Sequence, residues 1–157
     1  MPKANLKKVI SILLTLTYVA LTGCSGPEEK KAKRLQQAGE LKAAGDHKTA
    51  LATLDELSTE YPNDTEILRQ IGGIHQQLGN TAEAAFYLSA AHALSPDDVE
   101  LLYQTYRAQE NANQPAAAAE LLETLVKAEP DAITAELWRR LGEFRAAAQQ
   151  TQPALDA

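Results

Sequence analysis

The chain has 157 residues, and its 15 lysines and arginines against 21 aspartates and glutamates give it a formal net charge of −6. An acidic chain lacks the basic surface that binding to phosphate backbones requires, so nucleic acid is not an expected partner. A single cysteine excludes an intramolecular disulfide as a source of stability.

The first 23 residues differ from the rest of the chain. Three lysines within residues 3–8 precede an apolar run at residues 9–21, and small residues lead up to Cys24. A basic start, a short apolar stretch and a cut site predict a cleavable signal helix over residues 1–23. A helix that spans a bilayer needs about 20 apolar residues, so an uncleaved membrane anchor is the less favoured alternative.

The segment ends in Leu21, Thr22, Gly23 and Cys24. These four residues resemble the lipobox of bacterial lipoproteins. The resemblance implies recognition of the first three by a signal peptidase, cleavage before Cys24, and attachment of lipid with palmitate-type chains to that cysteine, where two or more acyl chains give stable anchoring. Ser25 stands where an aspartate commonly signals inner-membrane retention, so the resemblance implies the periplasmic face of a Gram-negative outer membrane. The alternative for Cys24 is an ordinary thiol.

Both ends of the remaining chain are expected to be irregular. Gly26 and Pro27 interrupt regular structure in a polar tether over residues 24–29. A flexible tail is expected over residues 149–157. The helical domain lies between them, over residues 30–148.

A repeat organises that domain. Pro62, Pro96 and Pro130 stand 34 residues apart, with an alanine twelve residues and a leucine eight residues before each of them. A constant period of this length is typical of stacked helical repeats. The predicted units are residues 31–64, 65–98 and 99–132.

Each unit is expected to hold two helices joined by a tight turn. Gly45, Gly79 and Asn113 take equivalent places in the three turns, and these residue types tolerate a left-handed backbone. Apolar residues recur at helical spacing in each unit. Neither helix buries its apolar side alone, so neighbouring units must stack to form a core. A simple seven-helix bundle is the alternative.

The second unit holds the clearest signature, in Leu68, Ile71, Gly72, Gly79, Ala84, Leu88, Ala91 and Pro96. These residues resemble the tetratricopeptide repeat family. Further on, Trp138, Leu141 and Gly142 resemble the opening of a fourth repeat that has no second helix, and they predict a capping helix over about residues 133–148. The resemblance implies an all-α fold, a right-handed α-solenoid of three helix-turn-helix units with a capping helix, whose first helices line a concave face.

Residues for catalysis or metal binding do not gather in the sequence. The histidines His47, His75 and His92 are not spaced as a metal-binding pair on one helix, and the His-Glu-x-x-His zinc motif does not occur. A nucleophile on a tight turn and a glycine-rich phosphate loop are also missing from the sequence. We therefore expect no enzyme, no metal, and no cofactor apart from the covalent lipid on Cys24.

The resemblance assigns certain first-helix residues to the concave face. Carried over unit by unit, they include Lys42, Arg69, Gln76, Tyr103, Arg107 and Arg139. Arg69, Tyr103 and Arg139 take equivalent places, which would align an aromatic ring between two guanidinium groups. Arg and Tyr often carry binding energy at interfaces, whereas the alternative is that these are ordinary surface side chains in ion pairs. Some relatives grip carboxylates with lysine and asparagine where Leu35 and Gly39 stand here, so that clamp is not expected.

These observations favour an adaptor anchored to the outer membrane, which binds another envelope protein non-covalently. Its task would be to assist assembly of an envelope complex, in secretion, pilus, outer-membrane or cell-wall machinery. Two alternatives stay open. The protein is a fixed structural subunit of an envelope complex, or it is an inner-membrane adaptor that keeps its N-terminal helix as an anchor.

Overall fold

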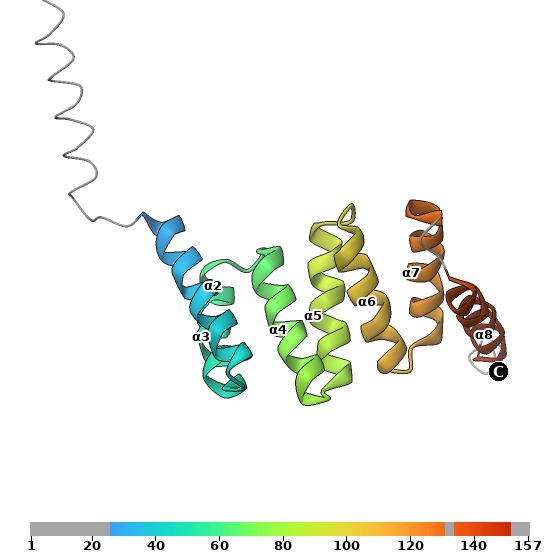
Figure 1. Cartoon of the computed structure of the whole chain (residues 1–157), viewed down its shortest axis with the longest axis horizontal. Helices are drawn as coiled ribbons and strands as arrows, with labels where there is room; N and C mark the ends of the chain where they lie inside the picture. Colours follow the sequence, from blue (N-terminus) through green and yellow to red (C-terminus); the bar gives the residue numbers. More distant parts are fainter. Residues whose placement is uncertain (1–25, 131–133, 152–157) are drawn as a thin grey trace, which may run out of the picture. The chain divides into compact units, whose positions relative to one another are not determined.

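The computed structural model describes residues 26–130 and 134–151, and within these ranges it forms seven helices and no strand. The helices are α2 (Pro27–Ala43), α3 (His47–Glu60), α4 (Thr65–Leu78), α5 (Thr81–Leu94), α6 (Val99–Asn111), α7 (Pro115–Ala128) and α8 (Ala135–Thr151) (Figure 1). None of them is long and apolar enough to span a membrane. Leu21, Thr22, Gly23 and Cys24 lie outside the described residues, so the lipobox stays a prediction.

The chain divides into two compact units, residues 1–33 and 34–157. In the first unit, the described residues 26–33 form the opening turns of α2, where Lys31 pairs with Glu28 at 3.1 Å. The helix begins at Pro27, earlier than the expected start near Lys30. Proline is preorganised for the first helical position, and two glutamates in the first turn suit the positive end of the helix dipole.

The turns inside the hairpins have the backbone that the sequence predicts. Gly45, Gly79 and Asn113 have positive φ angles of 83°, 75° and 55°. The left-handed residue lets the chain reverse directly after the first helix. At Gly79 the backbone N–H donates back to the carbonyl of Gln76, at 3.1 Å, which closes the end of α4.

The links between hairpins use aspartate caps. The Asp64 carboxylate accepts hydrogen bonds from the N–H groups of Glu66 and Ile67 at the start of α4, at 3.0 and 3.1 Å. Asp98 caps α6 in the same way through the N–H of Leu101. Each cap satisfies backbone donors that the first turn of a helix leaves without partners. Before α8 a hydroxyl takes this place, since Thr134 accepts from the N–H of Leu137 at 3.4 Å.

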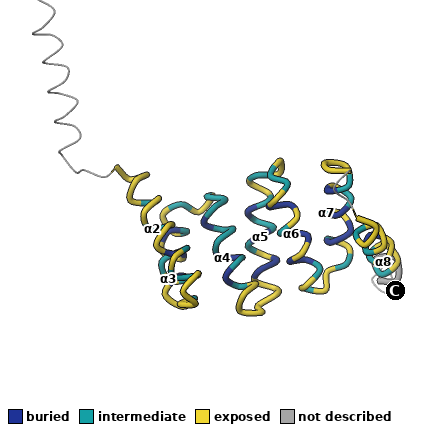
Figure 2. Tube along the Cα trace, viewed as in Figure 1, coloured by how far each residue is buried: buried dark blue, intermediate teal, exposed yellow. Residues whose placement is uncertain are grey.

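The core of the unit 34–157 is divided along the chain. Each helix from α3 to α8 packs against the next, and buried side chains recur at each contact (Figures 1 and 2). One cluster joins α2, α3 and α4 through Ala38, Ala50, Leu54, Leu57, Ile67, Ile71 and Ile74. A second joins α5 and α6 through Ala85, Leu88, Ala91, Leu101 and Ala108. A third joins α6, α7 and α8 through Leu102, Tyr106, Ala118, Ala119, Leu122, Leu125 and Leu141. Separate clusters in chain order distinguish a solenoid from a bundle with one central core.

Glycine permits a close approach of α4 and α5, at Gly72 on α4. A Cβ atom added there would stand 2.7 Å from Cγ of Leu88 and 3.3 Å from its backbone nitrogen on α5. Leu88 is buried, as are Ala84 and Ala91 on either side of it. The glycine therefore leaves the space into which the leucine of the second helix fits.

A buried hydroxyl lies at the contact between α5 and α6, which joins the second and third hairpins. Thr105 is buried, and its hydroxyl donates to the carbonyl of Leu101 at 2.8 Å on its own helix. It also lies 3.2 Å from the carbonyl of Leu88 on α5. Because its hydroxyl is satisfied, threonine is tolerated in the core between α5 and α6.

Candidate functional site

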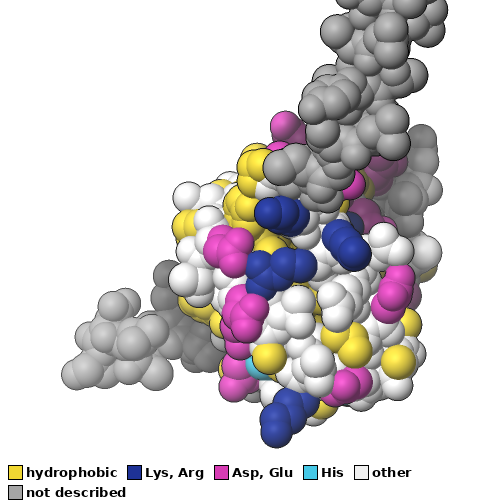
Figure 3. All heavy atoms as spheres, turned by 90° about the vertical axis from the view of Figure 1, so that its left-hand side faces the viewer, with side chains coloured by type: hydrophobic (Ala, Val, Ile, Leu, Met, Phe, Trp, Pro, Cys, Tyr) yellow, Lys and Arg dark blue, Asp and Glu magenta, His cyan; other side chains and the backbone are white. Residues whose placement is uncertain are grey.

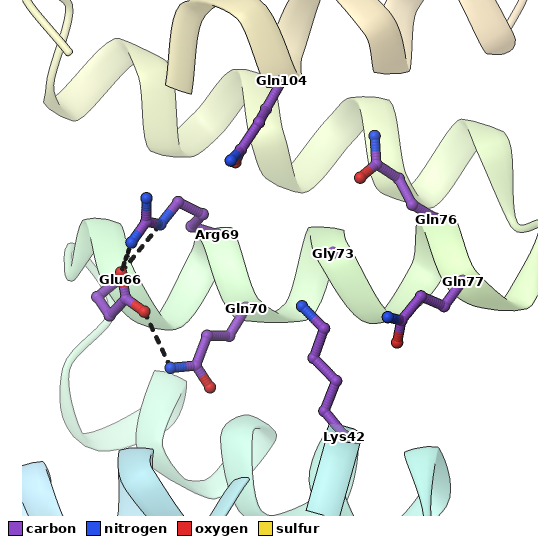
Figure 4. A pocket seen from close by; sticks show the side chains of 8 residues that line it. All are labelled: Lys42, Glu66, Arg69, Gln70, Gly73, Gln76, Gln77 and Gln104. Carbon is purple, nitrogen blue, oxygen red and sulfur yellow. Dashed lines mark hydrogen bonds and ion pairs between the residues drawn. The ribbon is translucent and has the colours of Figure 1, made fainter. Parts of the chain in front are cut away.

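One face of the unit 34–157 is hollowed where first helices of successive hairpins meet. This amide hollow, of about 610 Å³, is lined by Lys42 from α2, by Glu66, Arg69, Gln70, Gly73, Gln76 and Gln77 from α4, and by Gln104 from α6 (Figure 4). Four of its side chains are carboxamides, which both donate and accept hydrogen bonds. Its lining is therefore polar and adaptable to peptide-like ligands.

A lysine from the neighbouring helix reaches over a glycine in this hollow. Lys42 extends from the end of α2 toward α4, and its ammonium group lies at Gly73 (Figure 4). A Cβ atom on Gly73 would stand 2.8 Å from Nζ of Lys42. The half-buried Lys42 has no ion-pair partner among the described residues. The glycine thus makes room for a cation that no carboxylate of the described chain neutralises.

A single carboxylate organises the other end of the amide hollow. Glu66 accepts hydrogen bonds from Nε and Nη2 of Arg69, at 2.9 and 2.6 Å, and from the amide nitrogen of Gln70, at 2.9 Å (Figure 4). The amide oxygen of Gln70 is buried and has no hydrogen-bond partner among the described atoms. Buried acceptors of this kind usually have partners, so this oxygen is an exception among the described side chains of the hollow.

A second hollow, of about 490 Å³, lies between α6, α7 and α8. This tyrosine hollow is lined by Val99, Glu100, Tyr103, Arg107, Leu125, Glu129, Thr134, Glu136 and Leu137. Tyr103 is 40% exposed, and its ring contacts that of the buried Tyr106 with centroids 5.9 Å apart. The tyrosine hollow is more apolar than the amide hollow, since three aliphatic side chains and an aromatic ring line it.

Comparisons with known proteins agree with this architecture. The family model for the tetratricopeptide repeat matches residues 75–141. The fold is a tetratricopeptide repeat solenoid. A comparison with curated protein sequences finds no match.

Three solved structures illustrate the likeness of the tetratricopeptide fold. A mutant of the O-GlcNAc transferase of Thermobaculum terrenum is 24% identical over 65% of this chain, with a TM-score of 0.56, and this chain spans 20% of its length. The MamA protein is 18% identical over 82% of this chain and 69% of its own, with a TM-score of 0.66. The first repeat domain of Spaghetti (RPAP3), bound to the HSP90 peptide SRMEEVD, is 15% identical over 81% of this chain and 99% of its own, with a TM-score of 0.63. At these identities the likeness shows the fold alone.

The structure distributes the residues expected on the concave face between the two hollows. Arg69 and Gln76 line the amide hollow, whereas Tyr103 and Arg107 line the tyrosine hollow. The expected single row of Arg69, Tyr103 and Arg139 is therefore not found in one hollow.

Arg139 lines neither of the two hollows described above. Its guanidinium bonds to Glu136 and Glu143 on its own helix. The hydrogen bond from Arg139 lowers the pKa of Glu136. This arrangement is the surface ion pair that the sequence left open as an alternative for the arginines, and Arg69 forms one as well.

Several residues that line the amide hollow were not anticipated. Gln70, Gln77 and Gln104 contribute amides to the hollow, and Gly73 gives Lys42 its place. The polar residues at helical spacing along α4 could have indicated that the glutamines share a face. Gly73 gave no such indication, because glycine inside a helix is ordinarily only destabilising. Among the described residues no group of histidine, cysteine and acidic side chains is arranged to hold a metal ion.

Proposed function

We propose that this protein is a lipid-anchored adaptor of the bacterial envelope, which captures a segment of another envelope protein in its amide hollow. Tetratricopeptide domains bind protein partners, and one structural neighbour is described as bound to a peptide that carries two glutamates and an aspartate. The residues Leu21 to Cys24 support an anchor on the periplasmic face of the outer membrane. Anchoring would raise the effective concentration of partners that share the membrane.

The unpaired Lys42 is the observation that carries the binding proposal. Lys42 is half-buried, lines the amide hollow and has no ion-pair partner among the described residues. Exposed amides at Gln76 and Gln77 match the alternating N–H and C=O groups of an extended backbone. The chemistry therefore suits an extended segment with a carboxylate that reaches Lys42, while the amides hold its backbone.

Capture from detergent-solubilised envelopes tests this proposal. The full-length protein is immobilised, and the partner is recovered and then titrated against variants. Lys42→Met should weaken binding by about 1.5–3 kcal/mol, roughly tenfold to a hundredfold, which is the size of a lost charged hydrogen bond. Gly73→Ala should also weaken it, because the new methyl group displaces Nζ while the charge stays.

The matched control is Lys48→Met, which removes an exposed lysine of α3 that does not line the amide hollow. It should bind as the unaltered protein does. Equal binding by Lys42→Met, Lys48→Met and the unaltered protein would refute the amide hollow as the capture site.

The anchor is tested separately. Radiolabelled palmitate should enter the protein, and Cys24→Ala should abolish the incorporation and release the protein from the membrane fraction. An intact mass equal to that of the full chain, with no label, would favour the inner-membrane alternative with an uncleaved helix.

A fixed structural subunit is the second candidate function, and an exposed ring favours it. Phe86 on α5 is 68% exposed, the most of the large apolar side chains described, and it is outside both hollows. Phe86→Ser should release the protein from an envelope complex under this alternative. It should leave capture unchanged if the amide hollow alone engages the partner.

A further inference from the structure

Helix α8 resembles a first helix, and no second helix follows it among the described residues. Its residues Trp138, Leu141 and Gly142 have the spacing of Leu68, Ile71 and Gly72 in α4. In α4, this face is covered by α5 of the same hairpin. The chain therefore contains both a covered and an uncovered example of the same surface.

The covered example shows what fits. At Gly72 an added Cβ would meet Leu88 at 2.7 Å, so the leucine of α5 fills the space over the glycine. Ala84, four residues before this leucine, and Ala91, three residues after it, are each at most 1% exposed. The covering helix thus has the pattern Ala-x-x-x-Leu-x-x-Ala, in which small residues let the helices approach and leucine fills the gap.

The uncovered example is open at every corresponding place. A Cβ added to Gly142 would meet nothing described within 4 Å. Ala135, Trp138 and Ala146 are exposed, and the helical period puts them on one face with this glycine. Trp138 is 51% exposed. We call these four residues the open face of α8.

The other side of α8 is occupied. Leu141 is buried with α6 and α7, and Leu137 and Phe144 pack against the same cluster. Arg139 and Arg145, which flank the open face, are paired with glutamates. The arginines at the edges of the open face are therefore already neutralised, and a partner would contact the open face mainly through its apolar side chains.

We propose that the open face of α8 binds one helix of a different protein, with the pattern Ala-x-x-x-Leu-x-x-Ala on its contact side. The helix would complete the fourth hairpin, with its leucine over Gly142 and its side chains against Trp138. A second copy of this chain does not supply it, because the second helices α3, α5 and α7 already pack with their leucines buried. Their leucines Leu54, Leu88 and Leu122 are at most 1% exposed.

A stapled peptide with the sequence of residues 81–94 serves as the probe, since it has the pattern at Ala84, Leu88 and Ala91 and carries no tryptophan. It is titrated into the full-length protein in nonionic detergent. Trp138 is the one tryptophan of the chain, so its fluorescence reports binding directly. We expect a saturable blue shift, and none with the peptide variant Leu88→Asp.

Gly142→Leu blocks the seat of the incoming leucine without a clash inside the free protein. It should weaken binding of the probe by roughly tenfold or more, with unchanged helical circular dichroism. Gly39→Leu is the matched control, since a Cβ there also meets nothing described within 4 Å, and α2 is not part of the open face. Its affinity for the probe should equal that of the unaltered protein.

Three results would overturn the proposal. They are the absence of any shift with the probe, equal shifts with the aspartate peptide, and probe binding by Gly142→Leu that equals that of Gly39→Leu. Sedimentation of the unaltered protein gives a fourth. Dimers that disappear in Gly142→Leu would make a second copy the occupant and contradict the assignment to a different protein.

Discussion

Replacing Gly72 and Gly142 by alanine, one at a time, should change stability in opposite directions. Both glycines lie inside helices, so both replacements gain about 0.5–1 kcal/mol of helix stability from reduced backbone freedom. At Gly142 the new Cβ meets nothing described within 4 Å, so the gain stands alone. At Gly72 it would lie 2.7 Å from Cγ of the buried Leu88 and 3.3 Å from its backbone nitrogen, and overpacking of this kind costs about 1–3 kcal/mol.

The helix propensity term cancels between the two variants, so the difference between their stabilities isolates the clash. We expect Gly72→Ala to be less stable than Gly142→Ala by about 1–3 kcal/mol. Urea unfolding followed by helical circular dichroism measures both, and Gly39→Ala, which also adds a Cβ in open space, provides a third reference. If Gly72→Ala proved as stabilising as Gly142→Ala, the close approach of α4 and α5 would be refuted, and the template for the open face of α8 with it.

Two further predictions concern a buried phenol and a helix cap. Burial, and to a lesser degree the charge of Glu110, raises the pKa of Tyr106 to about 12, against about 10 in an unfolded chain. Folding thus favours the neutral phenol, so its contribution is fully present below about pH 10 and is lost between about pH 10 and 12; Tyr106→Phe should flatten the pH dependence of the unfolding midpoint in that range, and an unchanged slope would contradict the assignment. Asp64→Ala should destabilise the protein by about 1 kcal/mol in urea unfolding, because two backbone donors lose their acceptor. Asn80→Ala should cost less, because Asn80 makes no side-chain cap bond. Equal losses of stability in the two variants would argue against the cap at Asp64.

The repeat and its turns were predictable because each depends on local chemistry. Gly79 and Asn113 adopt the left-handed backbone that their residue types tolerate, and Asp64 caps the helix that follows its proline. The start of α2 differs from the expectation, since the helix begins at Pro27 and not near residue 30. A proline such as Pro27 is compatible both with the end of a tether and with the first position of a helix. The two glutamates after it favour the helix, because they suit the positive end of its dipole.

The helices that carry the candidate residues were predictable, but the division of these residues between two hollows was not. The repeat period assigned Arg69 and Tyr103 to first helices, and the structure has them there. It did not reveal that they line separate hollows, because that depends on how α6, α7 and α8 pack together. Nor did it reveal the place of Lys42 over Gly73, which depends on the distance between two helices rather than on the sequence of either.

The surface shown in Figure 3 carries both basic and acidic side chains. Basic and acidic side chains are interspersed on the end turned toward the viewer in Figure 3. Arg34 illustrates the pattern, since it donates at 2.7 Å to both Glu56 and Glu60 of α3. Exposed pairs of this kind add little stability, so specificity is better sought in the hollows and in the open face of α8.

The division of the core into clusters has a consequence for ancestry. No cluster spans the array from α2 to α8, so each hairpin depends on its immediate neighbours for burial. Duplication or deletion of a 34-residue cassette would therefore preserve the contacts at every remaining junction. A lineage of such proteins is therefore free to vary in length by whole cassettes.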